Sequence, residues 1–132
     1  MRRIIVDLAI IWSISAIVRF TNLGTIHLLD RDEPRNAGCA LEMTQRGDWV
    51  TPIFNDELRF QKPVLTYWLI MSAYQMFGVN EFAARFWSAA LATGTVLLTY
   101  SIGRRLFSPR AAVWAAGVLS TTLMFNVAAR AA

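Results

Sequence analysis

The stretch from Phe82 to Gly103, FAARFWSAALATGTVLLTYSIG, decides the fold class, because its 22 residues carry a single charge, Arg85. An α-helix needs about 20 predominantly apolar residues to cross the hydrocarbon core of a bilayer. Two more stretches, residues 4–20 and 111–129, are apolar over a similar length. The sequence therefore predicts an all-α integral membrane protein, a helical bundle with about three transmembrane helices at 4–20, 82–103 and 111–129.

The composition of the 132-residue chain supports this fold class. Hydrophobic residues make up 55% of the chain and charged residues 17%, against about a quarter charged in a typical soluble domain. The net charge is +4, because 13 basic residues outnumber nine acidic ones. The basic residues are 12 arginines and one lysine, Lys62, and they lie scattered beside apolar runs. This distribution favours membrane topology over a nucleic-acid-binding face. We therefore expect a lipid bilayer as a partner, and no nucleic acid.

The distribution of arginines predicts the topology. Arg2 and Arg3 precede the first apolar stretch and place the N-terminus in the cytoplasm. No small-x-small site follows that stretch, so it is predicted to be an uncleaved anchor rather than a signal peptide. The apolar stretch 63–77 is short and rich in aromatic residues, so it either lies at the interface or spans. We predict an interfacial helix, because this choice brings a basic loop to the inside, formed by Arg104, Arg105 and Arg110.

This topology makes residues 21–80 an extracytoplasmic loop of a multi-pass protein in the inner or plasma membrane. Within the loop, Glu33–Arg46 is predicted to be a short helix. Asp32 would cap it, Pro34 suits its first turn and Gly47 would end it. Residues 48–59 are predicted to be irregular. Seven of the nine acidic residues fall in this loop: Asp30, Asp32, Glu33, Glu42, Asp48, Asp56 and Glu57.

Two clusters in the loop carry side chains suited to chemistry. The run Asp30-Arg31-Asp32-Glu33 gathers carboxylates that raise one another's proton affinity, and one could act as a base. The alternative is a helix cap with solvated charges. The run Arg59-Phe60-Gln61-Lys62-Pro63 places a cation where it could bind a lipid phosphate, or merely snorkel to the headgroups.

Other patterns carry less information. Glu81 and Arg85 stand at i and i+4, which predicts a salt bridge. His27 and Cys39 have no neighbours at metal-ligand spacing, and the chain has no glycine-rich phosphate loop. A transporter is disfavoured because the apolar stretches hold few polar residues and no pair of broken helices is visible.

Several ordered motifs resemble the polyprenyl-phosphate glycosyltransferases, the family of the dolichyl-phosphate-mannose protein mannosyltransferases and the aminoarabinose transferases that modify lipid A. The run from Asp32 to Ala37, DEPRNA, resembles the D-E-x-R-Y-A motif of that family. The matching motifs continue in order along almost the whole chain: Leu41-Glu42-Met43, Gly47 to Pro52, Phe60 to Pro63, Tyr67-Trp68, Phe77 to Arg85 and Gly103 to Phe107.

The resemblance implies a polytopic helical bundle with an extracytoplasmic active site. Such an enzyme transfers a glycosyl group, with inversion, from a polyprenyl-phosphate-linked sugar to a lipid, glycan or protein acceptor. Asp32 matches the catalytic acidic position, which would activate or position the acceptor. Lys62 matches the lysine that binds the carrier phosphate, while Arg35 and Glu33 join it as substrate-binding positions, Arg35 also supporting the loop.

Three departures from the family pattern qualify these expectations. Gln61 replaces a glutamate linked to metal binding in some members, so we predict no metal and no cofactor. Asn36 replaces the usual tyrosine. Family members run to several hundred residues, so we interpret residues 1–132 as the N-terminal part of a glycosyltransferase domain, inactive alone. The alternative is a non-catalytic small membrane protein that binds polyprenyl-phosphate lipid or acts as a scaffold.

Overall fold

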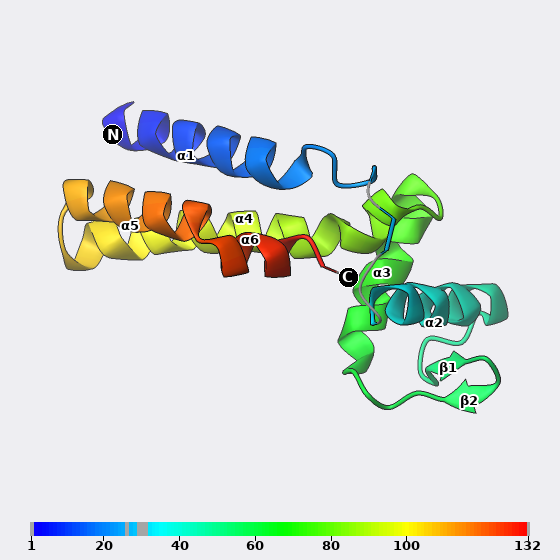
Figure 1. Cartoon of the computed structure of the whole chain (residues 1–132). Helices are drawn as coiled ribbons and strands as arrows, with labels where there is room; N and C mark the ends of the chain where they lie inside the picture. The colour runs from blue at the N-terminus through cyan, green and yellow to red at the C-terminus, as the bar shows by residue number, and fades with distance from the viewer. Residues whose placement is uncertain (1, 26, 29–31, 132) are drawn as a thin grey trace. The chain divides into compact units, whose positions relative to one another are not determined.

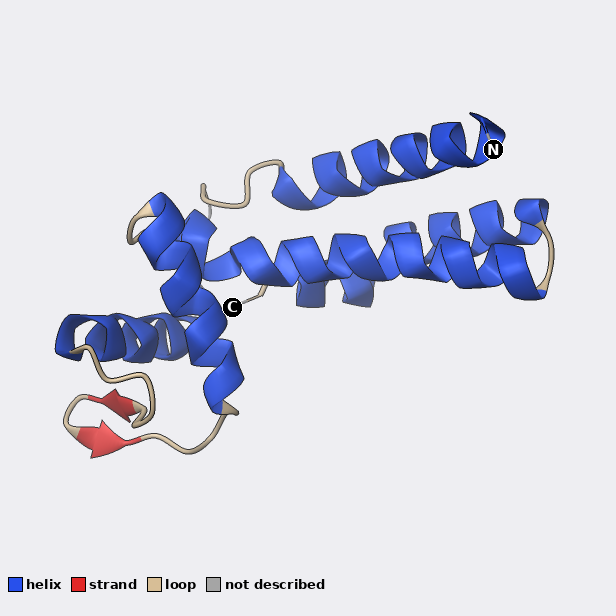
Figure 2. Ribbon diagram, turned by 180° about the vertical axis from the view of Figure 1, so that it is seen from behind, coloured by secondary structure: helices blue, strands red, loops and turns tan. Residues whose placement is uncertain are grey.

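The computed structural model describes residues 2–25, 27–28 and 32–131, and it confirms a mostly helical chain. Its contacts divide the chain into two compact units (Figures 1 and 2). The first unit comprises Met1–Thr21 and Ser88–Arg130, and the second Asn22–Trp87 with Ala131–Ala132. The elements are α1 (Arg2–Phe20), α2 (Glu33–Arg46), β1 (Ile53–Phe54), β2 (Glu57–Leu58), α3 (Val64–Phe77), α4 (Glu81–Leu106), α5 (Pro109–Thr121) and α6 (Leu123–Ala129).

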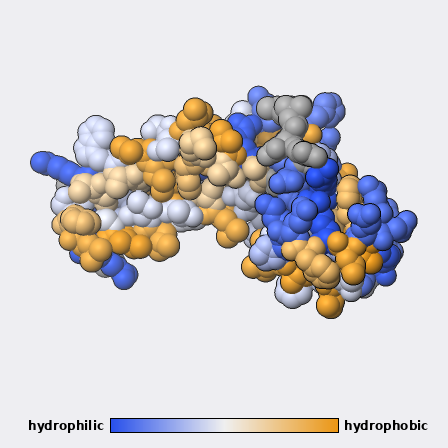
Figure 3. Space-filling view, turned by 60° about the horizontal axis from the view of Figure 1, so that its bottom comes forward, coloured by the Kyte–Doolittle hydropathy of each residue, from blue (hydrophilic) through white to orange (hydrophobic). Residues whose placement is uncertain are grey.

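The first unit is built from α1, most of α4, α5 and α6. Small residues let these helices approach closely, since Ala112 and Ala116 of α5 pack on Val96 and Tyr100 of α4. The hydroxyl of Tyr100 donates a hydrogen bond of 2.8 Å to the Asp7 carboxylate of α1. Many large apolar side chains remain exposed, and Figure 3 shows hydrophobic side chains on the outer surface. Outward-facing apolar side chains are typical of helices that contact lipid.

Among the described residues, α4 is the one unbroken helix that is long and apolar enough to cross a membrane. The predicted span 111–129 is instead divided between α5 and α6, which are bent by 66° at Thr122. Residues 111–129 therefore do not form one continuous helix, as the predicted span assumed. The hydropathy of the sequence does not reveal the break, because it is averaged over the whole stretch. The side-chain amide of Asn126 stabilises the break by donating to the carbonyls of Ser120 at 2.7 Å and Thr122 at 3.1 Å.

In the second unit α2 packs against α3. The bounds predicted for the helix after Asp32 are confirmed, and Gly47 ends it in the left-handed conformation with φ of 68°. Asp32 occupies the N-cap position, but its side chain makes no capping hydrogen bond, contrary to prediction. Helix α3 confirms the predicted helix at 63–77, with 14 residues. The shared core of α2 and α3 contains Ala37, Cys39, Ala40, Met43, Tyr67, Ile70, Met71, Ala73 and Tyr74.

The segment predicted to be irregular contains a small β-hairpin. Strands β1 and β2 are antiparallel, with Ile53 opposite Leu58 and Phe54 opposite Glu57. The two turn residues, Asn55 and Asp56, have positive φ values of 53° and 62°. Two successive left-handed residues form the tight turn whose twist suits a hairpin, and Asn and Asp tolerate that conformation best after glycine.

Candidate functional site

Asp32 and Lys62 both belong to the second unit, where Asp32 precedes α2 and Lys62 precedes α3. The Asp32 side chain is 54% exposed, and its Oδ1 lies 3.8 Å from Nη2 of Arg59. Lys62 follows Arg59 by three residues, a length of chain that reaches at most about 11 Å. The Arg59 contact therefore brings the segment that carries Lys62 into the neighbourhood of the Asp32 carboxylate.

Arg59 is the buried cation of this site. Its side chain is 9% exposed, although it carries a full charge. Its backbone amide donates to the Pro52 carbonyl at 2.8 Å, and its Nη2 donates to Oδ1 of the buried Asn36 at 3.4 Å. Its Nε is buried and has no hydrogen-bond partner among the described residues. The guanidinium thus joins the end of the hairpin segment to the first turns of α2 and retains one unused donor.

The neighbours of Arg59 on the core side are uncharged. Burial raises the pKa of the Cys39 thiol, with the Arg59 charge opposing that shift. Burial likewise raises the pKa of Tyr67, and the side-chain contact with Arg59 opposes that shift. The Tyr67 hydroxyl is fully buried and makes no hydrogen bond within the described part of the chain. At neutral pH neither group becomes an anion, so neither neutralises the guanidinium.

Glu33, the residue after Asp32, is held in a buried ion pair with Arg85. Nη2 of Arg85 lies 2.8 Å from Oε2 of Glu33 and Nε lies 3.3 Å from Oε1, and both side chains are 7% exposed. Arg85 also donates to the carbonyls of Leu23 at 3.1 Å and His27 at 3.2 Å. A single side chain at the start of α4 therefore fixes the chain on both sides of Asp32.

This pairing corrects the prediction for Arg85. Its salt bridge is formed with Glu33, which is 52 residues away, and not with Glu81 at i−4. Glu81 lies instead 3.5 Å from Nδ1 of His27. The predicted substrate-binding role of Glu33 stays a prediction, and its carboxylate is already occupied by a cation.

Lys62 and Arg35 present free cations at the surface. Lys62 is exposed and Arg35 is partly exposed. Neither makes an ion pair or a side-chain hydrogen bond with any described residue. The structure thus leaves both charges available to an anionic group. Asp30 and Arg31, which belong to the predicted carboxylate run, lie outside the described residues.

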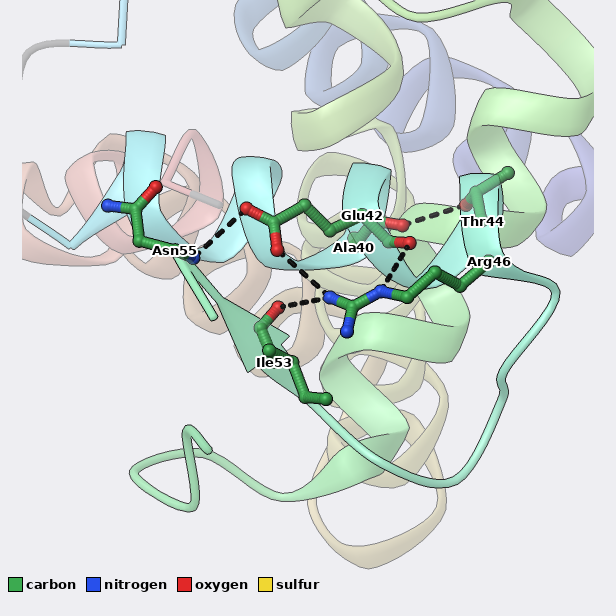
Figure 4. A network of polar contacts seen from close by, with 6 residues as sticks. All are labelled: Ala40, Glu42, Thr44, Arg46, Ile53 and Asn55. Atoms are coloured by element: carbon green, nitrogen blue, oxygen red, sulfur yellow. Dashed lines mark hydrogen bonds and ion pairs between the residues drawn. The ribbon is translucent and has the colours of Figure 1, made fainter. Parts of the chain in front are cut away.

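A polar network fastens the hairpin to α2 (Figure 4). The Glu42 carboxylate accepts a hydrogen bond from the backbone N–H of Asn55 at 3.1 Å and another from Nη2 of Arg46 at 2.9 Å. The same Arg46 nitrogen lies 3.4 Å from the Ile53 carbonyl. The hairpin also lies close to α2 at Gly38, where an added Cβ would meet the Phe54 ring at 2.6 Å. A larger residue at this helix position would therefore have to displace the Phe54 ring.

The turn that leads into the hairpin is fixed by Asp48. Its Oδ1 accepts hydrogen bonds from the amides of Val50 at 2.8 Å and Thr51 at 3.1 Å. These two bonds favour the ionised carboxylate and lower the pKa of Asp48. The turn leads to Pro52, whose carbonyl accepts from the Arg59 amide, so Asp48 helps to place Arg59.

Two of the hollows on the surface differ in the charge of the residues that line them. One of about 120 Å³ lies beside the hairpin and is lined by Phe54, Glu57, Leu58, Arg59 and Gln61. A larger apolar one of about 650 Å³ runs along α1 in the first unit and offers no charged group to a phosphate. Within the described residues, no three His, Cys, Asp or Glu side chains gather as a metal would require. Metal independence stays a prediction.

Sequence reasoning chose Asp32 and Lys62 but overlooked Arg59 as a site residue. It included Arg59 in the cluster Arg59-Phe60-Gln61-Lys62-Pro63 but assigned the phosphate-binding role to Lys62, because the sequence gives no sign that Arg59 is buried beside Asp32. Tyr67 was noted for its motif and not for its buried hydroxyl. The useful signal was the position of Arg59, three residues before the single lysine of the chain.

The chain is similar to known membrane glycosyltransferases. A family model described as dolichyl-phosphate-mannose-protein mannosyltransferase matches residues 61–132. An uncharacterized protein of Aquifex aeolicus is 38% identical over 86% of this chain and 23% of its own length. An undecaprenyl phosphate-alpha-4-amino-4-deoxy-L-arabinose arabinosyl transferase 2 of Pseudomonas fluorescens is 42% identical over 65% of this chain and 16% of its own length.

A solved structure agrees with this similarity. The crystal structure of ArnT from Cupriavidus metallidurans bound to undecaprenyl phosphate is 32% identical, with a TM-score of 0.85. The match covers 92% of this chain and 23% of that one. The chain thus spans less than a quarter of the length of these relatives.

Proposed function

The chain belongs to the dolichyl-phosphate-mannose-protein mannosyltransferase family, and from this membership we propose that its protein transfers a glycosyl group from a polyprenyl-phosphate-linked sugar. The acceptor is a lipid, glycan or protein, and transfer takes place on the extracytoplasmic face of the inner or plasma membrane. The observation that carries the proposal is an exposed carboxylate, Asp32, joined through Arg59 to the segment that ends in the free cation of Lys62.

The proposed reaction is a displacement at the anomeric carbon of the donor sugar. A hydroxyl or amine of the acceptor attacks that carbon from the side opposite the carrier, and its proton passes to the Asp32 carboxylate. The bond from the anomeric carbon to the phosphate oxygen breaks, and the carrier phosphate leaves with the electron pair. The configuration at the anomeric carbon is inverted.

Lys62 holds the carrier phosphate in this scheme. Its ammonium is exposed and unpaired among the described residues, and it lies directly before α3. A cation at this position attracts the phosphate before reaction and stabilises the charge that grows on it as the sugar leaves. The ArnT structure bound to undecaprenyl phosphate supports a polyprenyl-phosphate ligand for this fold. Arg35 provides a second free cation for the substrate, and no metal takes part.

The proposed topology follows from the same assignment. Helix α4 and the broken pair of α5 and α6 are assigned as two spans. Helix α1 is assigned as the third from the apolar stretch 4–20 of the sequence, with the N-terminus in the cytoplasm. The second unit then lies on the outer side. Helix α3 has only 14 residues, and its core-facing side chains pack on α2, which supports an interfacial position.

The test measures transfer from a radiolabelled polyprenyl-phosphate sugar in membranes that contain the full-length protein with this sequence. Asp32→Asn should lower the turnover number by about 10²- to 10⁴-fold, as expected for loss of a general base. Lys62→Ala should weaken donor binding by roughly 10- to 100-fold, because a hydrogen bond to a charged group contributes about 1.5–3 kcal/mol. Matched controls are Asp56→Asn in the hairpin turn and Arg105→Ala in the last turn of α4, and both should transfer normally. Unchanged turnover in Asp32→Asn and Lys62→Ala together would remove the site assignment.

A further inference from the structure

The side chain of Asp32 does not perform the task usual for its position. An aspartate at the N-cap normally accepts a hydrogen bond from an amide of the first helical turn. Asp32 makes no such bond. Its one ion pair within the described residues is with Arg59, at 3.8 Å. The orientation of the Asp32 carboxylate is therefore set by the guanidinium of Arg59 and not by the backbone amides of the first turn of α2.

Arg59 is well placed to direct that carboxylate. Its backbone is fixed by the hydrogen bond to Pro52, and its side chain is only 9% exposed. Its neighbours on the core side, Cys39 and Tyr67, have raised pKa values and stay neutral. The positive charge therefore remains available to Asp32, and the same Nη2 atom also donates to Oδ1 of Asn36 at 3.4 Å.

The contact is longer than a strong ion pair. A charge-assisted N–H···O bond measures about 2.7–2.9 Å, whereas Nη2 of Arg59 lies 3.8 Å from Asp32 and 3.4 Å from Asn36. Catalytic contacts are often long without substrate and shorten when the substrate binds. Arg59 can move from Asn36 towards Asp32 because its Nε is not tied to any described partner.

We propose that Arg59 is a positioning residue, which holds the ionised Asp32 carboxylate in the orientation in which it accepts the acceptor proton. The inference rests on the proposed function and deepens it. Arg59 touches neither the donor nor the acceptor and acts through Asp32. Removing it should therefore affect the chemical step, whereas removing Lys62 should affect donor binding.

The test compares Arg59→Met, Arg59→Lys and the control Arg46→Met in the full-length protein. Arg46 also joins the hairpin segment to α2, but it pairs with Glu42 and not with Asp32. The first measurement is carbodiimide-driven amine labelling of Asp32, followed by peptide mass spectrometry, with the exposed Asp56 as internal reference. The second is the separation of kcat from the KM for the donor. Retention of the fold is checked by protection of the Cys39 thiol.

The expected result is faster labelling of Asp32 in Arg59→Met, with a kcat reduced by about 100-fold, as for a misplaced catalytic group. The KM for the donor should stay within about two-fold of the wild-type value. Arg59→Lys should partly restore both the slow labelling of Asp32 and the kcat. Arg46→Met should match the wild type in both measurements. Unchanged labelling of Asp32, unchanged kcat, or an equal loss in Arg46→Met would each overturn the inference. A wild-type protein that transfers no sugar overturns the proposed function and the catalytic part of the inference, and the labelling still shows whether Arg59 holds Asp32.

Discussion

Replacing Glu33 by alanine should destabilise the second unit strongly. The change leaves the Arg85 guanidinium buried without its carboxylate, and breaking a buried ion pair from one side costs about 3–5 kcal/mol. Arg85 keeps its hydrogen bonds to the carbonyls of Leu23 and His27, so we expect a loss of about 3 kcal/mol, at the lower end of that range. In a domain of 60–100 residues, each kcal/mol lost from the free energy of unfolding lowers the thermal unfolding midpoint by about 4–8 °C. The expected loss therefore predicts a decrease of this midpoint by roughly 12–24 °C.

The single cysteine of the chain provides the assay. Cys39 is fully buried in the core shared by α2 and α3, so a thiol-reactive fluorogenic dye reports the opening of the second unit as the detergent-solubilised protein is heated. Glu57→Ala is the matched control, because Glu57 is exposed on the hairpin and makes no ion pair with a described residue. Its thermal unfolding midpoint should stay within about 2–4 °C of the wild type, because surface substitutions usually change stability by no more than about 0.5 kcal/mol.

The double variant Glu33→Ala with Arg85→Met shows whether the loss of stability comes from the buried Arg85 charge or from the loss of the Glu33 side chain itself. If the loss comes from burying the Arg85 charge without the Glu33 carboxylate, removing that charge should restore most of the thermal unfolding midpoint. A decrease below about 3 °C in Glu33→Ala, against the far larger decrease expected for loss of the Glu33 carboxylate from a buried ion pair, would refute the energetic reasoning. A double variant no better than the single one would show that the charge is not the cause.

Two further predictions concern the hairpin. Gly38→Ala should lower the midpoint in the same dye assay by an amount equivalent to about 1–3 kcal/mol, because its Cβ would meet the Phe54 ring at 2.6 Å; Phe54→Ala in the same chain should recover part of the loss, and no recovery would place the strain elsewhere. The pKa of Asp48 is lowered by its bonds to the Val50 and Thr51 amides, so its contribution to stability is present above the unfolded value of about 3.9 and is lost as the pH falls through the lower folded value. Hydrogen exchange of the Val50 and Thr51 amides should accelerate in that acidic range relative to Asp48→Asn, and identical pH profiles in the two proteins would contradict the assignment.

Local signals in the sequence were sufficient to predict α2 and α3. A proline in the first turn and a glycine at the end mark the bounds of α2, and Pro63 and Gly78 bracket α3. These residues act through their own backbone conformation, so their effect does not depend on the rest of the fold. The cap itself was predicted wrongly, because the Asp32 side chain has an alternative partner, Arg59, that is distant in sequence.

Interactions between distant residues could not be predicted in the same way. Glu81 is the acidic residue at helical spacing from Arg85, whereas the true partner, Glu33, depends on how α2 and the start of α4 fold together. The hairpin was missed because strands of two residues show no alternation of apolar and polar side chains. The turn residues Asn55 and Asp56 were the available signal. The break at Thr122 was missed because hydropathy measures apolar length and not helix direction.

The pair between Glu33 and Arg85 also sets an order of events during synthesis. The ribosome adds Arg85 52 residues after Glu33, so the start of α2 cannot reach its final arrangement until the beginning of α4 has emerged. The entropic cost of closing a loop of n residues grows only as about (3/2)RT ln n. The pair therefore forms late because Arg85 is synthesised late, and not because closing the loop between the two residues is too costly. The nascent chain therefore completes the surroundings of Asp32 only when it begins its longest apolar helix.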